Sequence, residues 1–226
     1  MVLENIKIIF KKKYMKNIFK NISILLLCAV DFAIYINSNY IIMLTKTDLN
    51  GEIYGIIDDS LTTEIENVTY INYDNSNRKN ESHGEKLCRF ANDNYKNFEI
   101  YYYNAEINGQ ISSENIIYGL DELKDRGVNK INISLSSKIY SDGLQNWISE
   151  HKDIKIFASY NNKINTYDYP AMYEGVVASG KYNDVIKFKE CDVKYNSMNI
   201  IGINSLKKYS GNSFLSLVSM FKNEQY

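Results

Sequence analysis

Short apolar runs alternate with stretches of helical periodicity along the chain beyond residue 45. Compact runs of β-branched and aromatic residues, bounded by glycine or polar positions, are typical of strands. They predict strands over residues 51–58, 98–103, 128–136, 154–159 and 175–179. Residues 62–82 are mostly polar and predict one more strand followed by an exposed loop.

Between these predicted strands, apolar residues recur at the spacing of an α-helix. This spacing predicts helices that begin near His83, run from Ser113 to about Asp125, run from Leu144 to Glu150, and begin at Ser213. Strands that alternate with helices of about 10 to 15 residues favour a mainly parallel sheet with helices on both faces. The expected fold class is therefore a doubly wound α/β domain, in which reacting groups lie at the carboxyl ends of the strands.

The composition is that of one folded domain. The chain has 226 residues, and 45% of them are hydrophobic, which is enough for one sizeable core. Its 26 basic and 27 acidic side chains give a formal net charge of -1, so no nucleic-acid partner is predicted. The cysteines Cys28, Cys88 and Cys191 lack the paired spacing of a zinc site or a disulfide framework. We interpret them as free thiols and predict no metal site.

Residues 1–45 are predicted to be an extension of a domain that covers residues 46–226. Lysines precede an apolar run over residues 22–36, which Asp31 interrupts. A basic segment followed by a short apolar one is typical of a secretory signal or a membrane anchor, which would make the protein secreted or membrane-anchored. The charge of Asp31 and the short run favour instead an amphipathic extension packed on a cytoplasmic domain. Both alternatives stay open.

Four residues place different chemical groups where this architecture exposes side chains. Asp58 ends a predicted strand with a carboxylate, and His83 offers an imidazole at a helix start. Asn161 follows another strand with a carboxamide, and Ser213 offers a hydroxyl at the start of the last helix. Taken singly, each has an ordinary structural role as a cap, a turn residue or an exposed side chain. The only other histidine, His151, lies at a predicted helix end, and we interpret it as solvated.

Six motifs in this order resemble those of the subtilase family of serine peptidases, over roughly residues 50 to 220. They are Ile56-Ile57-Asp58-Asp59-Ser60-Leu61 (aspartate), His83-Gly84-Glu85-Lys86-Leu87-Cys88 (histidine), Ile131-Asn132-Ile133-Ser134-Leu135-Ser136 (substrate strand), Phe157-Ala158-Ser159-Tyr160-Asn161 (asparagine), Tyr169-Pro170-Ala171 with Gly175-Val176-Val177-Ala178-Ser179-Gly180 (next strand) and Gly211-Asn212-Ser213-Phe214 (serine). Each motif alone is weak, but six in the right order are fairly specific. The resemblance implies a three-layer subtilisin-like fold.

The resemblance also implies a serine endopeptidase with a catalytic triad. Ser213 would attack the scissile carbonyl, His83 would accept the proton of the serine, and Asp58 would hold the imidazole in the correct tautomer. Asp59 is an alternative for the acid, but the strand register favours Asp58.

Further residues are assigned to substrate binding by the same resemblance. Asn161, together with the backbone N–H of Ser213, would donate to the developing oxyanion. Ser134, Leu135 and Ser136 would bind an extended peptide or protein substrate by strand pairing. No cofactor is implied, and binding of a structural calcium ion is left open.

Two residues near the implied chemistry depart from the usual family pattern. Tyr160 stands where a glycine usually precedes the asparagine. Ser136 stands where a glycine usually follows Ser-Leu, which would narrow the first specificity pocket. We therefore predict a restricted substrate, such as the leader of a modified peptide. Two alternatives are kept: a catalytically inactive peptide-binding module of the same fold, and an unrelated α/β ligand-binding domain.

Overall fold

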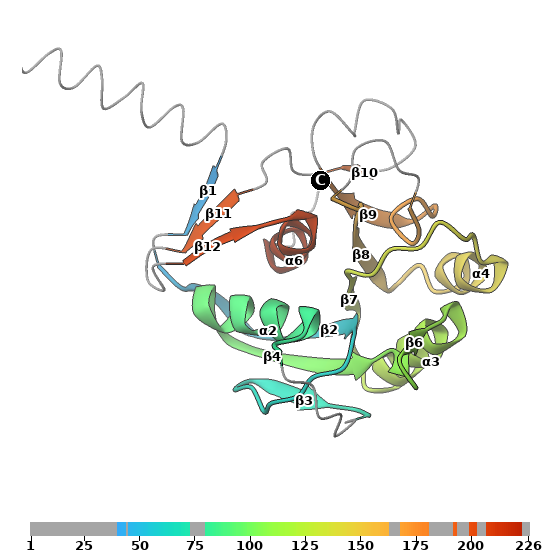
Figure 1. Ribbon diagram of the computed structural model, residues 1–226, viewed down its shortest axis with the longest axis horizontal. Coiled ribbons are helices and arrows are strands. Elements are labelled where there is room, and N and C mark those ends of the chain that lie inside the picture. Colours follow the sequence, from blue (N-terminus) through green and yellow to red (C-terminus); the bar gives the residue numbers. More distant parts are fainter. Residues whose placement is uncertain are drawn as a thin grey trace, which may run out of the picture. The chain divides into compact units, whose positions relative to one another are not determined.

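The computed structural model describes residues 40–43, 45–72, 80–162, 168–180, 192–193, 199–202 and 207–222 (Figure 1). All of these except Tyr40 belong to one structural unit, residues 41–226. The apolar run over residues 22–36 lies outside the described residues, as do Cys28 and Cys191. The predictions for the N-terminal extension therefore stay predictions. In the described part of the chain, no helix is both long enough and apolar enough to cross a membrane.

A seven-stranded sheet lies at the centre of the described residues. Its strands, in spatial order, are β10 (Asp192–Val193), β9 (Val176–Ser179), β8 (Lys155–Ser159), β7 (Lys130–Ile133), β2 (Thr47–Asp58), β4 (Tyr95–Asn104) and β3 (Val68–Tyr70). Every neighbouring pair in it is parallel. The chain enters the sheet at β2, then places β3 and β4 on one side of it and β7 to β10 on the other, which confirms the predicted doubly wound, mainly parallel arrangement.

Helices cover both faces of this sheet (Figure 1). The helices α2 (His83–Asn94) and α6 (Asn212–Lys222) contribute to one hydrophobic core, and α3 (Ser113–Asp125) and α4 (Asp142–Glu150) contribute to another. Successive residues of a strand point to opposite faces. Accordingly, Ile56 of β2 belongs to the first core and Ile57 to the second. The result is the predicted three-layer α/β architecture.

Smaller elements differ more from the sequence prediction. A second sheet has the strand order β1 (Tyr40–Met43), β11 (Asn199–Gly202) and β12 (Lys207–Ser210). A short hairpin is formed by β5 (Glu106–Ile107) and β6 (Gln110–Ile111). The hydrophobic pattern does not predict this hairpin, because its strands are only two residues long. The strand predicted over residues 128–136 ends as β7 at Ile133, so residues 134–136 lie beyond the sheet ladder.

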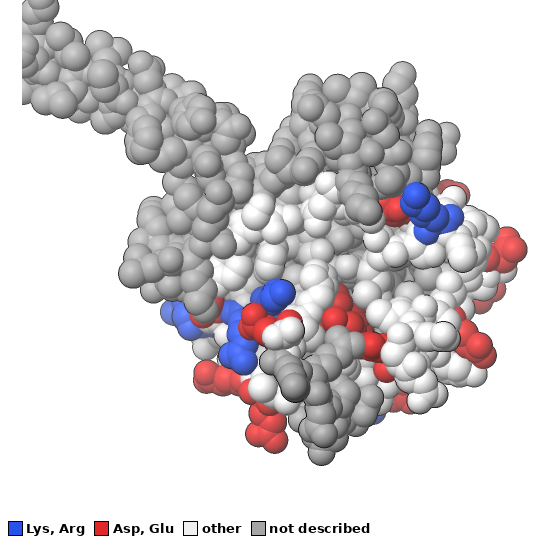
Figure 2. Space-filling view, in the orientation of Figure 1, with Lys and Arg blue, Asp and Glu red and all other residues white. Residues whose placement is uncertain are grey.

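Charges of both signs are mixed on one face of the molecule. Figure 2 shows lysine and arginine side chains at separate places among acidic and uncharged ones. On this face of the described part they form no continuous basic surface. The mixture agrees with the formal net charge of -1.

Candidate active site

A cavity of about 300 Å³ lies where strands end and helices begin. All seven site residues predicted from the sequence line it: Asp58, His83, Asn161, Ser213, Ser134, Leu135 and Ser136. They meet because β2 and β8 end at the same edge of the parallel sheet, where α2 and α6 begin. The topology thus gathers segments that are far apart in the sequence.

The histidine enters this cavity from a capped helix start. The Ser82 hydroxyl accepts a hydrogen bond from the backbone N–H of Glu85 at 3.1 Å, and the Glu85 carboxylate accepts one from the backbone N–H of Ser82 at 3.0 Å. Glu85 also accepts hydrogen bonds from the backbone N–H and hydroxyl of Thr62, at 2.9 and 2.6 Å. Burial raises the pKa of Glu85, but these hydrogen bonds outweigh burial and lower the pKa overall. The cap therefore fixes the helix end that carries His83.

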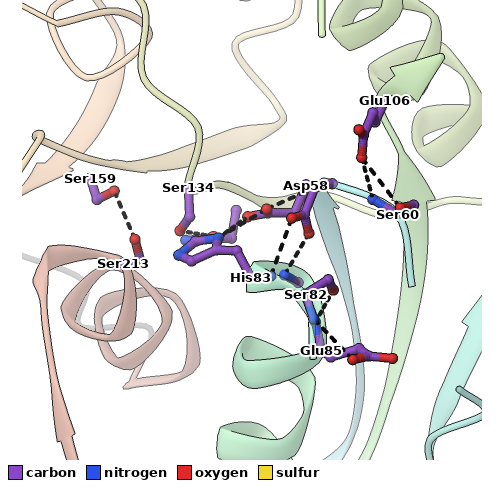
Figure 3. Close-up of polar contacts among 12 residues, drawn as sticks. Asp58, Ser60, Ser82, His83, Glu85, Glu106, Ser134, Ser159 and Ser213 are labelled. Atoms are coloured by element: carbon purple, nitrogen blue, oxygen red, sulfur yellow. Dashed lines mark hydrogen bonds and ion pairs between the residues drawn. The ribbon is translucent and has the colours of Figure 1, made fainter. Parts of the chain in front are cut away.

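Asp58 holds the His83 ring. The Nδ1 atom of His83 lies 2.9 Å from Oδ1 and 3.0 Å from Oδ2 of Asp58 (Figure 3). The Asp58 side chain is fully buried, whereas 40% of the His83 side chain is exposed. Burial raises the pKa of Asp58. Burial lowers the pKa of His83, but the hydrogen bond and the charge of Asp58 outweigh it and raise the pKa overall.

The neighbouring carboxylate, Asp59, contacts backbone groups. It accepts hydrogen bonds from the backbone N–H groups of His83 at 3.2 Å and Gly84 at 2.8 Å, where a carboxylate also meets the positive end of the helix dipole. Glycine is needed at position 84, because a Cβ atom would lie 1.7 Å from the Tyr102 hydroxyl. That hydroxyl donates to the backbone carbonyl of Asp59 at 2.5 Å. Of the two aspartates, Asp58 is therefore the one that meets the imidazole.

Ser213 lies in the first turn of α6 and lines the same cavity. Its Oγ atom is 3.5 Å from Oγ of Ser159, which ends β8 (Figure 3). No hydrogen bond joins Ser213 to His83, both of which are described residues. Catalytic hydrogen bonds are often long until substrate binds. The structure thus brings the hydroxyl and the imidazole to one cavity without joining them.

Asn161 presents its carboxamide to the cavity just after β8. Its Nδ2 atom donates to the Ser136 hydroxyl at 3.4 Å, and its backbone N–H donates to the Asp168 carboxylate at 3.2 Å. The Tyr160 side chain is 2% exposed and packs in the second core, with its hydroxyl 3.5 Å from the Met172 sulfur. The bulky residue that replaces glycine is thus accommodated in the core, and Ser136 directly contacts the carboxamide beside it.

Sequence reasoning missed a buried polar network that joins β7 to α6. The Asn132 carboxamide donates to the Ser216 hydroxyl at 2.6 Å, and the Ser134 hydroxyl donates to Oδ1 of Asn132 at 2.6 Å. All three side chains are buried. One signal exists, because Asn132 interrupts an apolar strand and a buried amide needs hydrogen-bond partners. The partner in α6 is 84 residues away, so the sequence does not identify it.

A second cavity, of about 240 Å³, adjoins the first. The two share Ile111, Leu135 and Ser136 in their linings. The second cavity is also lined by apolar and aromatic side chains, among them Leu144 and Tyr173. It therefore offers an apolar surface next to the residues predicted to bind a peptide.

Two further residues considered in the sequence, His151 and Cys88, do not line the first cavity. His151 follows α4, where its Nδ1 atom is 2.8 Å from the Trp147 carbonyl oxygen and its ring stacks on the Trp147 indole. It lies at a helix end as predicted, but it is half-buried and not fully solvated. Cys88 is a free, buried cysteine. Over the described ranges, no cluster of histidine, cysteine and acidic side chains could hold a metal ion.

Comparisons with known proteins bear on the fold. No protein-family model and no curated protein matches the chain. A mutant of the protease domain of PatA aligns with a TM-score of 0.57 and 15% identity, over 78% of each chain. A cold-adapted subtilisin-like serine proteinase aligns with a TM-score of 0.55 and 16% identity, over 79% of this chain and 78% of the other.

The prenylagaramide maturation protease PagA is similar to the same extent, with a TM-score of 0.54 and 14% identity over 76% of this chain and 74% of the other. The chain spans only 37% of the subtilisin-like protease Apa1 from the Antarctic psychrotroph Pseudoalteromonas sp. AS-11, which has a TM-score of 0.48, 21% identity and 59% coverage of this chain. Identities this low establish the fold alone. The chain has the α/β fold of the subtilisin-like proteases.

Proposed function

We propose that this protein is a serine endopeptidase that uses Ser213, His83 and Asp58 to hydrolyse peptide bonds. The observation that supports it is the contact of both Asp58 carboxylate oxygens with Nδ1 of His83, in a cavity that also contains Ser213. Serine is a poor nucleophile at neutral pH and needs an adjacent base. Asp58 keeps the proton of the imidazole on Nδ1, so Nε2 is the nitrogen that accepts the serine proton.

The reaction proceeds in two acyl-transfer steps. His83 takes the proton of Ser213 as the serine oxygen attacks the carbonyl carbon, and returns it to the leaving amine when the C–N bond breaks. Water then hydrolyses the acyl-enzyme by the same route. The Nδ2 group of Asn161 and the backbone N–H of Ser213 donate to the oxyanion in both steps. Loss of one such donor typically costs about 10²–10³-fold in rate.

The substrate is a peptide or protein segment in extended conformation. Residues 134–136 continue the chain beyond β7 and line the cavity, and we expect their backbone groups to pair with an added strand. Ser136 contacts Asn161 in this part of the cavity, and we expect its side chain to leave less room for substrate than glycine would. A restricted substrate follows, such as the leader of one processed peptide. The similarity of the fold to PagA, a maturation protease, supports this role.

Labelling with a fluorophosphonate probe tests the proposal. The probe reacts with an activated serine and stays attached to it. The folded protein is expected to gain one label, which mass spectrometry of its fragments places on Ser213. Protein unfolded before exposure serves as the control and stays unlabelled. A folded protein that does not react at Ser213 contradicts the proposal.

A catalytically inactive peptide-binding module is the second candidate. It is favoured by the hydroxyl of Ser213, which contacts Ser159 and not His83. Such a module would retain an extended peptide intact, whereas the peptidase releases fragments from it. The third candidate, an unrelated ligand-binding domain, loses support because Asp58 and His83 are in hydrogen-bond contact.

The pH dependence of labelling follows from the pKa of His83. Asp58 raises this pKa above the ordinary value of 6.5 despite the opposing effect of burial. Only the neutral imidazole accepts the serine proton, so the labelling rate falls as the pH drops through the raised pKa. We therefore expect the acid limb of the rate profile to have its midpoint above pH 6.5. Second-order rate constants measured between about pH 5 and 9 check this, and a midpoint below the ordinary histidine value contradicts it.

The second cavity is expected to select an apolar side chain of the substrate. Ile111 lines both cavities and is 39% exposed, so Ile111→Ser removes apolar contact surface without disturbing the core. In this variant, we expect kcat/KM to fall by about tenfold for peptides whose side chain in the second cavity is large and apolar, relative to peptides with glycine at the same position. A fluorogenic peptide library measures the ratio. Ile53→Ser is the matched control, because Ile53 is 40% exposed and lines neither cavity. Equal ratios for both variants contradict the prediction.

A further inference from the structure

Asn212, the residue before Ser213, joins the two segments that carry the proposed oxyanion donors. Its side chain is fully buried. Its Nδ2 atom donates to the backbone carbonyl of Tyr160 at 3.0 Å and to that of Asn161 at 3.3 Å. Its backbone N–H donates to Oδ1 of Asn162 at 2.9 Å. Three hydrogen bonds from one residue thus tie the start of α6 to residues 160–162.

The orientation of this amide is determined by its partners. A carbonyl oxygen only accepts hydrogen bonds, so two carbonyl groups require the NH₂ group of Asn212 to face them. The opposite atom, Oδ1, is buried and has no hydrogen-bond partner among the described residues. A buried acceptor without a partner disfavours the folded state. An apolar side chain would avoid that cost, but it could not hold the two carbonyl groups.

We infer that Asn212 is a positioning residue of the proposed peptidase, which sets the distance between the Asn161 carboxamide and the backbone N–H of Ser213. The inference rests on the proposed function. The two donors lie 52 residues apart in the chain, one just after β8 and the other in the first turn of α6. Donors that stabilise an oxyanion act only when both are held close to its position. Asn212 provides that connection directly.

A double-mutant cycle with a fluorophosphonate probe tests the inference. The second-order rate constant for labelling of Ser213 is measured in the wild type, Asn212→Ala, Asn161→Ala and the double variant. We expect Asn212→Ala to lower it by about tenfold in the wild-type background and by less than about twofold in the Asn161→Ala background. The midpoint of the pH profile is expected to stay in place, because the contact of His83 with Asp58 is untouched.

Two further variants separate positioning from stability. Asn94 is also a buried asparagine whose Nδ2 donates to a backbone carbonyl, that of Phe90, but it lies outside the cavity. Asn94→Ala is therefore expected to lower the melting temperature without lowering the labelling rate. Asn162 is exposed, so Asn162→Ala removes one tie to Asn212 without a buried gap. It is expected to slow labelling about threefold, again only when Asn161 is present.

The outcomes are distinct. If Asn212→Ala lowers the rate by the same factor with and without Asn161, the side chain acts generally and the inference is wrong. If Asn212→Ala does not fold, the labelling rate of Asn162→Ala is compared with and without Asn161. A loss by the same factor in both backgrounds again makes the inference wrong. A wild type that resists the probe ends the proposed function and the inference with it, whereas a labelled wild type with additive losses ends the inference alone.

Discussion

Replacement of Ser213 with alanine is expected to abolish fluorophosphonate labelling and to lower peptide hydrolysis by about 10⁶-fold, since no covalent intermediate can form without the serine oxygen. The change removes one atom from a side chain that is 8% exposed at the start of α6. The fold is therefore expected to survive, with cooperative thermal unfolding retained. Labelling, cleavage and melting are measured on the same preparation, so that loss of reaction is not mistaken for loss of structure.

Ser159 provides the companion variant for this experiment. Its hydroxyl is the one in hydrogen-bond contact with Ser213, and it lines the same cavity. Ser159→Ala is expected to label still, and at Ser213. Labelling that persists in Ser213→Ala and moves to Ser159 would show that the wrong hydroxyl has been assigned as nucleophile.

The sheet and the chemical groups of the candidate site could be predicted because their signals are local. An apolar run that ends in Asp58, and apolar residues at helical spacing after His83, are visible in short windows of sequence. The choice between Asp58 and Asp59 followed from strand alternation, since neighbouring residues of a strand point in opposite directions. The contacts of the two carboxylates with ring and backbone agree with that choice.

The distances across the site could not be predicted, because they depend on how α6 packs against the sheet. That packing involves Asn132 with Ser216, 84 residues apart, and Asn212 with Tyr160, 52 residues apart. An asparagine in a strand or before a serine predicts a polar contact, but not its partner. Similarly, the ring of Tyr160 lies in the core beside residues of distant segments, so the sequence does not reveal where the side chain goes.

Asp58→Asn is expected to lower the labelling rate at neutral pH by about 10⁴-fold, the order observed when the acid of a Ser-His-Asp triad becomes an amide. The replacement has nearly the same shape, so the fully buried site is expected to keep its packing. An amide group can donate to Nδ1 of His83, which favours the tautomer whose Nε2 carries the proton and cannot act as a base. The charge that raises the pKa of His83 is also removed, so the acid limb of the remaining activity is expected to move to lower pH.

Asp59→Asn is the matched control, because it makes the same change one residue away. Asp59 accepts hydrogen bonds from the backbone of His83 and Gly84, and an amide oxygen can still accept from one of them. We expect its labelling rate to stay within about tenfold of the wild type, with a pH midpoint that moves less than that of Asp58→Asn. Equal losses in both variants would mean that the two carboxylates act through general stabilisation of α2. A large loss confined to Asp58→Asn requires instead that the ring contact itself controls the base, which is the role that the triad gives to this carboxylate.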